Sequence, residues 1–215
     1  MEHIIRRCKF FGFEPLVCTT TLGEDDVVRD IAQKEGCLFY RGSAEDKLQR
    51  WLGACDQFDI ESFHTVDADD PFFDGELGHK SLRLLDEGYD IVYPSSSIYI
   101  GGVGFSITSD IIRKACSLKE SDDTEMMWYF VEKVPDLRRI EIPVPDGRTA
   151  SVRLTLDYEE DYWMLLTVLR ILGPQATRQE IEDLFSRNPD LRQVNWFRNE
   201  QWKSLQVEKG KEAAG

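Results

Sequence analysis

The sequence predicts a three-layer α/β fold, in which helices cover both faces of a mostly parallel, Rossmann-like sheet. Short segments rich in β-branched and aromatic residues alternate with segments whose apolar residues recur at helical spacing. This alternation is typical of a parallel sheet covered by helices on both faces. Acidic residues also follow two of the predicted strands directly, at the edge where ligands bind in open α/β sheets.

The first half of the chain carries the clearest alternation. Strands are predicted at 15–21, 37–40 and 62–66, and helices at 25–35, 45–55 and 75–87. The helix at 45–55 is strongly indicated, because apolar residues beginning with Leu48 fall at i, i+3, i+4 and i+7.

The second half continues the pattern less regularly. A strand is predicted at 89–93, extended segments at 139–144 and 151–156, and helices at 107–118 and 161–172. Gly173-Pro174 ends the last of these, and the capping box Thr177-x-x-Glu180 opens another helix. We therefore expect a single domain over 1–206 and a frayed polar tail over 207–215.

Composition excludes several classes of protein. The chain has 215 residues, 41% of them hydrophobic, which is enough for a core and too many for disorder. No apolar run approaches the length of a membrane helix, and a net charge of −14 argues against nucleic acid as a partner. The five scattered cysteines indicate reduced thiols and hence a cytoplasmic protein, with neither a membrane nor a nucleic acid as partner.

The acidic run after the strand at 62–66 is the first candidate site. It contains Asp67, Asp69 and Asp70. Carboxylates at the carboxyl end of a strand suit Mg²⁺, which binds one or two of them together with substrate phosphates. The alternative is a solvated acidic turn that only ends the strand.

A second acidic run follows the extended segment at 151–156. Asp157 ends that segment, so it is the stronger candidate for a second carboxylate at a Mg²⁺–triphosphate site. Glu160 and Asp161 are better explained as residues that favour a helix N-terminus.

The segment Arg41–Arg50 is the third candidate. A strand, a small-residue turn and a helix start could present backbone N–H groups to an anion, with Lys47 and Arg50 nearby. The alternative, favoured on physical grounds alone, is that Ser43 caps the helix and the charges are ordinary surface charges. The run Gly101–Gly104 predicts a turn and lacks the context of a dinucleotide-binding loop.

These three segments, in this order, resemble the cytidylyltransferase family, in its spore-coat-polysaccharide branch. That branch is related to the synthetases of CMP-sialic acid and CMP-3-deoxy-octulosonate. The matching stretches are Thr19–Asp26, Phe39–Trp51, Asp67–Asp74, Arg153–Tyr162 and Asn188–Asn195.

The resemblance implies a Rossmann-like nucleotidyltransferase fold, a reaction and a set of residue roles. CMP would pass from CTP to an acidic sugar, a precursor of a cell-surface polysaccharide, with Mg²⁺ as cofactor and a homodimer as the assembly. Asp69 and Asp157 would be the catalytic residues and, with Asp67, the metal ligands. The residues that would border the nucleotide are Thr19, Gly42, Ser43, Lys47 and Arg50.

The chain also departs from the family. Members open with a buried strand and a loop rich in arginine and lysine that cradles the triphosphate, whereas the stretch Met1–Arg7 resembles the helix that follows that loop. Roughly 30 residues are missing by this comparison, the size of one strand–loop–helix approach. The strands at 15–21 and 62–66 must then pair with each other, recruit another strand, or leave backbone groups unsatisfied.

Two other functions fit part of the pattern. A metal-dependent glycosyltransferase would use Asp67-Ala68-Asp69 as an Asp-x-Asp motif, although the Arg153–Asp161 segment argues against it. A non-catalytic dimeric subunit would keep the fold after losing the chemistry, which agrees with the missing loop. The enzyme interpretation, for a chain that is either truncated or catalytically degenerate, remains the leading one.

Overall fold

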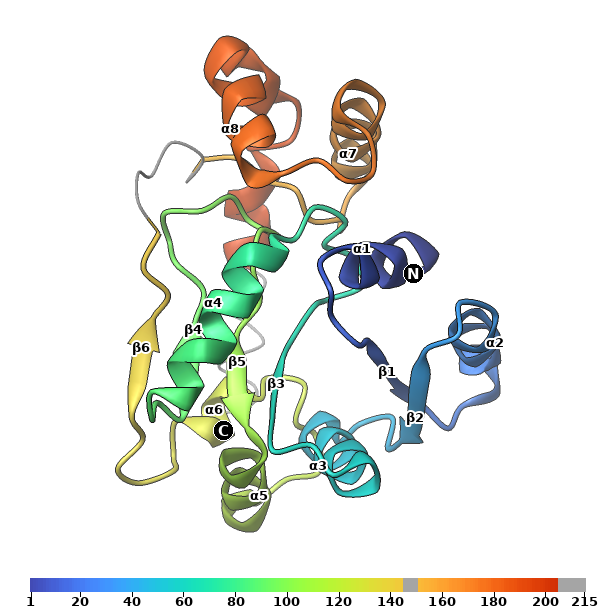
Figure 1. Cartoon of the computed structure of the whole chain (residues 1–215), viewed down its shortest axis with the longest axis vertical. Coiled ribbons are helices and arrows are strands. Elements are labelled where there is room, and N and C mark those ends of the chain that lie inside the picture. Colours follow the sequence, from blue (N-terminus) through green and yellow to red (C-terminus); the bar gives the residue numbers. More distant parts are fainter. Residues whose placement is uncertain (145–150, 205–215) are drawn as a thin grey trace.

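The computed structural model describes residues 1–144 and 151–204, and its strands form two separate sheets (Figure 1). The smaller sheet pairs β1 (Leu16–Thr20) with β2 (Leu38–Gly42) in parallel. The larger sheet has the order β3-β5-β4-β6, made of β3 (Ser62–His64), β4 (Ile91–Tyr93), β5 (Ser106–Thr108) and β6 (Arg139–Glu141).

Three strands of the larger sheet run in one direction. β5 is antiparallel to both β3 and β4, so β3 and β4 share a direction, and β6 is parallel to β4. The predicted mixed α/β fold with a mostly parallel sheet is therefore confirmed, with β5 as the one reversed strand among those described.

Helices cover these sheets. They are α1 (Glu2–Phe10), α2 (Asp26–Lys34), α3 (Lys47–Phe58), α4 (Gly75–Asp86), α5 (Ser109–Leu118), α6 (Trp128–Val131), α7 (Glu159–Leu172) and α8 (Arg178–Arg187). Short 3₁₀ turns lie at Gly23–Asp25 and Pro189–Val194. The predicted capping box is present, because Thr177 and Glu180 bond each other's backbone N–H groups at the start of α8. The predicted tail at 207–215 lies outside the described residues.

One sequence expectation about an element was wrong. The predicted helix at 107–118 begins only at Ser109, because Ile107 is fully buried and pairs with Ile91 and Phe63 in the sheet. The segment predicted as extended at 151–156 joins neither sheet, and it forms an isolated parallel bridge between Arg153 and Ile100.

β1 and β3 do not pair with each other. β1 bonds to β2 along one edge and β3 bonds to β5 along one edge, and no described strand pairs with the opposite edge of either. The two strands were expected to pair with each other, to recruit another strand, or to leave backbone groups without partners. The described residues show the third of these outcomes.

A buried arginine holds α1 to the rest of the molecule. Arg7 is only 2% exposed and donates hydrogen bonds to the carbonyl oxygens of Phe73 (2.9 Å), Pro174 (3.0 Å) and Ala176 (2.7 Å). These carbonyls belong to the chain before α4 and to the connection between α7 and α8. One side chain therefore fixes three segments that lie far apart in the sequence.

The cap of α3 differs from the expected one. Asp46, not Ser43, accepts the capping bond from the backbone N–H of Gln49 at 3.0 Å. Ser43 instead accepts from the backbone N–H of Asp46 at 3.0 Å. Asp46 is buried, accepts a hydrogen bond from Thr124 at 2.9 Å and forms an ion pair with Lys119.

Along the described part of the chain, no helix has the length and hydropathy that crossing a membrane requires. All five cysteines are free thiols, in agreement with the expected absence of a disulfide framework.

We predict that Asp46→Ala lowers the free energy of unfolding by about 1–3 kcal/mol, because it removes a helix cap and the buried partner of Lys119, which then keeps only its ion pair with the exposed Asp122. Asp56→Ala is the matched control: Asp56 also forms an ion pair from α3, but its side chain is 51% exposed. We expect the control to cost less than about 1 kcal/mol. Urea denaturation followed by circular dichroism measures both, and equal losses would contradict the assigned role of Asp46.

Candidate active site

The acidic run forms a compact turn directly after β3. Asp67, Asp69 and Asp70 each offer a carboxylate oxygen, and these oxygens all lie within 4.8 Å of one another. The backbone N–H of Asp70 donates to the carbonyl of Asp67 at 3.1 Å, which closes the turn. Three hard oxygen donors this close fit a divalent cation such as Mg²⁺.

Electrostatic repulsion accompanies this geometry. Burial raises the pKa of Asp69, and the charges of Asp67 and Asp157 raise it further, whereas Lys47 opposes them. Burial and the charge of Asp69 raise the pKa of Asp70 to about 8, although a hydrogen bond with Thr155 acts in the opposite direction. A bound cation would relieve this repulsion, so the electrostatics agree with the donor set.

The segment 152–157 lies against the acidic turn. The backbone N–H of Leu156 donates to the carbonyl of Asp69 at 3.0 Å. Ile100 also bonds this segment through both of its backbone groups. Its carbonyl accepts from the N–H of Leu154, and its N–H donates to the carbonyl of Val152, both at 2.9 Å. The fold thus brings together the two acidic runs that the sequence places about ninety residues apart.

Arg153 organises the second acidic run. Its side chain is fully buried and bonds both carboxylate oxygens of Asp161 at 3.0 Å, and it also forms an ion pair with Asp157. Asp161 in turn accepts from the backbone N–H groups of Asp157 (3.0 Å) and Tyr158 (3.1 Å), so it caps α7 as expected. Asn195 adds a bond of 2.8 Å to Asp161.

The predicted metal ligands are therefore in two different environments. Asp67 and Asp69 share the compact turn with Asp70, whereas Asp157 pairs with Arg153 and keeps its side chain 31% exposed. The exposed part of Asp157 remains available to a ligand, and its role in metal binding stays a prediction.

Lys47 is the predicted nucleotide-binding residue whose positive charge acts on the acidic turn, where it lowers the pKa of Asp69 against the effects of burial and of the neighbouring carboxylates. It opens α3, and it lines one cavity together with Asp67 and Ala68. Its ammonium lies 4.9 Å from the centroid of the Trp51 ring, which orients the side chain. A cation beside the carboxylates could neutralise phosphate charge.

The other predicted nucleotide-binding residues have packing roles. Arg50 bonds the carbonyls of Ser43 and Ala44, the latter at 3.3 Å, so its guanidinium closes the turn before α3. A Cβ atom on Gly42 would lie 2.9 Å from Arg50 Cγ, so the glycine gives that side chain room. Thr19 is buried in β1. Arg50 lines the same cavity as Lys47 and Asp67, and the predicted contact of these four residues with a nucleotide remains a prediction.

The glycine run contributes to the site, which the sequence analysis missed. Gly101 has φ +80°, and a Cβ atom there would lie 2.8 Å from Asp70 Oδ1 and 2.7 Å from the carbonyl of Leu154. A Cβ atom on Gly104 would lie 2.0 Å from the carbonyl of Thr65. The sequence signal was three glycines in four positions, which indicates close backbone approach as well as a turn.

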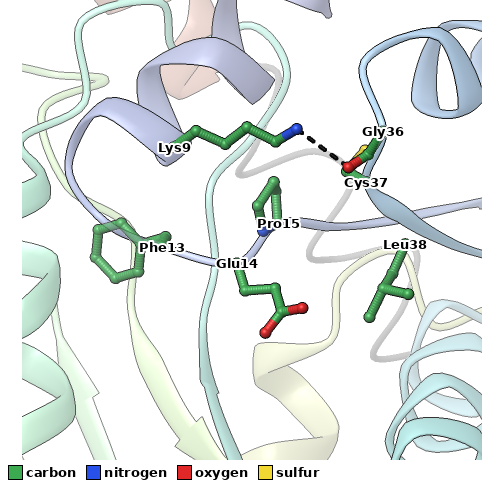
Figure 2. Close-up of a pocket in the computed structure, with 7 residues that line it drawn as sticks. All are labelled: Lys9, Phe13, Glu14, Pro15, Gly36, Cys37 and Leu38. Carbon is green, nitrogen blue, oxygen red and sulfur yellow. Dashed lines mark hydrogen bonds between the residues drawn. The ribbon is translucent and has the colours of Figure 1, made fainter.

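A second cavity lies away from the carboxylates, near the start of β1 and β2 (Figure 2). It measures about 440 Å³ and is lined by Lys9, Phe13, Glu14, Pro15, Gly36, Cys37 and Leu38. Lys9 spans it and donates to the carbonyl of Gly36 at 3.1 Å, so its charge is already engaged. None of the predicted site residues lines this cavity.

Comparison with known proteins agrees with this architecture. No protein-family model matches the chain. The chain is 24% identical over 200 residues to the spore coat polysaccharide biosynthesis protein SpsF of Bacillus subtilis, covering 88% of this chain and 83% of that one. It is also 24% identical over 185 residues to an uncharacterized protein of Methanocaldococcus jannaschii, covering 84% and 76% of the two chains.

Solved structures identify the fold. A cytidylyltransferase from Leptospira borgpetersenii superposes with a TM-score of 0.80 at 24% identity, over 89% of this chain and 84% of that one. A nucleotidyl transferase from Methanothermobacter superposes with a TM-score of 0.52 at 14% identity, over 79% and 80%. The chain therefore has the cytidylyltransferase fold, and the predicted resemblance to the spore-coat-polysaccharide type is confirmed.

We predict that Arg153→Ala lowers the free energy of unfolding by about 3–5 kcal/mol, because it leaves the buried carboxylate of Asp161 without its cation. Arg198→Ala is the control, since Arg198 pairs with Glu160 in the same turn of α7 but both side chains are 28–30% exposed. We expect the control to lose about 1 kcal/mol or less. Thermal and urea unfolding compare the two variants, and a larger loss in the control would refute the central role of Arg153.

Proposed function

We propose that this chain is a Mg²⁺-dependent cytidylyltransferase that transfers CMP from CTP to an acidic sugar used for a cell-surface polysaccharide. The observation that carries the proposal is the compact carboxylate turn of Asp67, Asp69 and Asp70, joined by the backbone to the segment ending in Asp157, within a cytidylyltransferase fold. The relative SpsF carries spore coat polysaccharide biosynthesis in its name, which supports the class of product.

Each candidate residue would have a distinct role in such a transfer. Asp67, Asp69 and the exposed part of Asp157 would hold Mg²⁺, which when bound neutralises the triphosphate and polarises the α-phosphate. Lys47 supplies a further positive charge next to the carboxylates. An oxygen of the acidic sugar forms a bond to the α-phosphorus of CTP as the bond to pyrophosphate breaks, and the protein acts mainly by positioning the reactants and by electrostatic stabilisation.

We predict that Mg²⁺–CTP at about 100 times its Kd stabilises the chain by about 2.7 kcal/mol, seen as a rise in melting temperature. Asp69→Asn should remove this rise and lower kcat/KM with an acidic sugar by roughly 100-fold, because a metal ligand is lost. Asp110→Asn is the control, since Asp110 is an exposed acid on α5.

Each alternative gives a different result in the same assays. Hydrolysis of UDP- or GDP-sugars without CTP turnover would replace the proposal by a glycosyltransferase. A cooperative unfolding curve that neither Mg²⁺–CTP nor Mg²⁺–UDP shifts would replace it by a non-catalytic subunit.

We further propose that the chain is a homodimer in the cytoplasm. Two large apolar side chains on one side of α7 remain exposed, since Trp163 and Ile171, eight residues apart, are 53% and 56% exposed. Exposed apolar groups that share a helix face are typical of an interaction surface.

We expect Trp163→Arg to convert a dimer into a monomer in multi-angle light scattering, because the charge disrupts this apolar surface. Val27→Arg is the matched control, since Val27 is 58% exposed on α2 and should leave the dimer intact. A wild-type monomer would contradict the proposed assembly.

A further inference from the structure

The turn that follows the 3₁₀ segment Pro189–Val194 brings a buried asparagine to the second acidic run. Asn195 is fully buried, and its side-chain nitrogen Nδ2 donates to the carbonyl oxygen of Arg153 at 2.9 Å and to Oδ1 of Asp161 at 2.8 Å. Carbonyl and ionised carboxylate oxygens only accept, so the nitrogen of the amide must face them, and this fixes the orientation of the side chain. One side chain thus joins two residues that are eight positions apart in the sequence.

The stretch between these two residues contains Asp157. Asp161 accepts from the backbone N–H of Asp157 at 3.0 Å and from that of Tyr158 at 3.1 Å, and Arg153 forms an ion pair with the carboxylate of Asp157. The main chain before Asp157 and the carboxylate that holds the main chain at Asp157 are therefore both bonded to Asn195. This two-point contact limits how far Asp157 can move relative to the rest of the fold.

Asn195 also completes the set of donors around Asp161. Oδ1 of Asp161 accepts from Nε of Arg153 and from Asn195, and Oδ2 accepts from Nη2 of Arg153 and from the two backbone N–H groups. The carboxylate of Asp161 is thus engaged within the protein and fully buried, whereas the side chain of Asp157 is 31% exposed. Without the bond from Asn195, Asp161 would depend more on Arg153, the cation that it shares with Asp157.

We propose that Asn195 is a positioning residue for the metal site, which holds Asp157 so that its exposed carboxylate meets the cation together with the acidic turn. Asn195 contacts neither the metal nor a substrate in this role and acts through Arg153 and Asp161. Loss of a partner that orients a metal ligand commonly weakens metal binding by roughly 10- to 100-fold. The inference rests on the proposed function, because it requires that Asp157 be a metal ligand.

The test measures metal binding by the 215-residue chain, first without nucleotide. Mn²⁺ is the probe, because carboxylate sites that take Mg²⁺ also take Mn²⁺, and electron paramagnetic resonance measures the free ion. We expect Asn195→Ala to raise the Kd for Mn²⁺ by at least roughly tenfold. Asn199→Ala is the matched control and should leave this Kd unchanged, since Asn199 is 1% exposed in the same segment and takes no part in the bonds described here for Asp161.

A second, milder variant keeps the test decisive if Asn195→Ala does not fold. Asn195→Ser retains a hydroxyl with one proton to donate, so it can satisfy only one of the two acceptors, and we expect it to weaken Mn²⁺ binding severalfold. Circular dichroism and urea unfolding establish which variants are folded. A folded variant of Asn195 that binds Mn²⁺ as tightly as the wild type would overturn the proposal.

Amide hydrogen exchange adds a measurement that needs no metal. The N–H groups of Asp157 and Tyr158 should exchange faster in Asn195→Ser than in the wild type, because the carboxylate that accepts from them is held less firmly. The N–H groups of Glu76 and Leu77 at the start of α4 are the internal control, since they donate to a different carboxylate and should exchange as before. Equal acceleration at both places would indicate a general loss of stability and contradict a positioning role.

The outcomes separate this inference from the proposed function. Mn²⁺ binding that the Asn195 variants weaken, in a chain that turns over no CTP, would keep the positioning role and remove the cytidylyltransferase activity. Mn²⁺ binding that they leave unchanged would remove the positioning role and leave that activity standing. No Mn²⁺ binding by the wild-type chain, with or without CTP, would overturn the role of Asn195 together with the metal site.

Discussion

The buried guanidinium of Arg153 is the interaction on which the arrangement of the site depends. It bonds Asp161 at the start of α7 and pairs with Asp157 at the end of the segment that follows the bridge to Ile100. The same segment bonds the acidic turn through Leu156 and Asp69. Removing either Arg153 or the carboxylate of Asp161 would leave a buried charge without its partner, which lowers stability. The cation and its two carboxylates therefore hold one another in place.

The acidic turn presents the opposite situation, because among the described residues no arginine is ion-paired with its carboxylates. Burial and the neighbouring carboxylates raise the pKa of Asp69, and the charge of Lys47 acts in the opposite direction. Holding three carboxyl groups within 4.8 Å of one another is electrostatically unfavourable when they are ionised, and burial together with this proximity raises the pKa of Asp70 to about 8. Ligand sites commonly carry this kind of uncompensated charge, whereas structural ion pairs, such as that of Arg153, do not.

Sequence reasoning recovered the alternating elements and the cytidylyltransferase fold because local periodicity and ordered motifs determine both. It failed where a tertiary contact outweighed the local pattern. The spacing of the apolar residues after Ile107 predicts a helix that includes it, yet Ile107 pairs with Ile91 and Phe63 and belongs to strand β5. Ser43 is a good capping residue, but Asp46 takes the cap because Lys119 and Thr124 stabilise its buried carboxylate.

The candidate site was predictable in part: its carboxylates were found from the sequence, but its glycine was not. The acidic run and the segment ending in Asp157 were identified as neighbours from their positions at strand ends, and the backbone bond between Leu156 and Asp69 joins them. The contribution of Gly101 was not predictable, since its reason is the approach of Asp70 and Leu154 to a position that has no Cβ atom. The concentration of carboxylates has a kinetic corollary. An anionic molecule approaching a chain of net charge −14 meets a repulsive field, so added salt should accelerate its arrival by screening that field over roughly 10 Å at 0.1 M ionic strength.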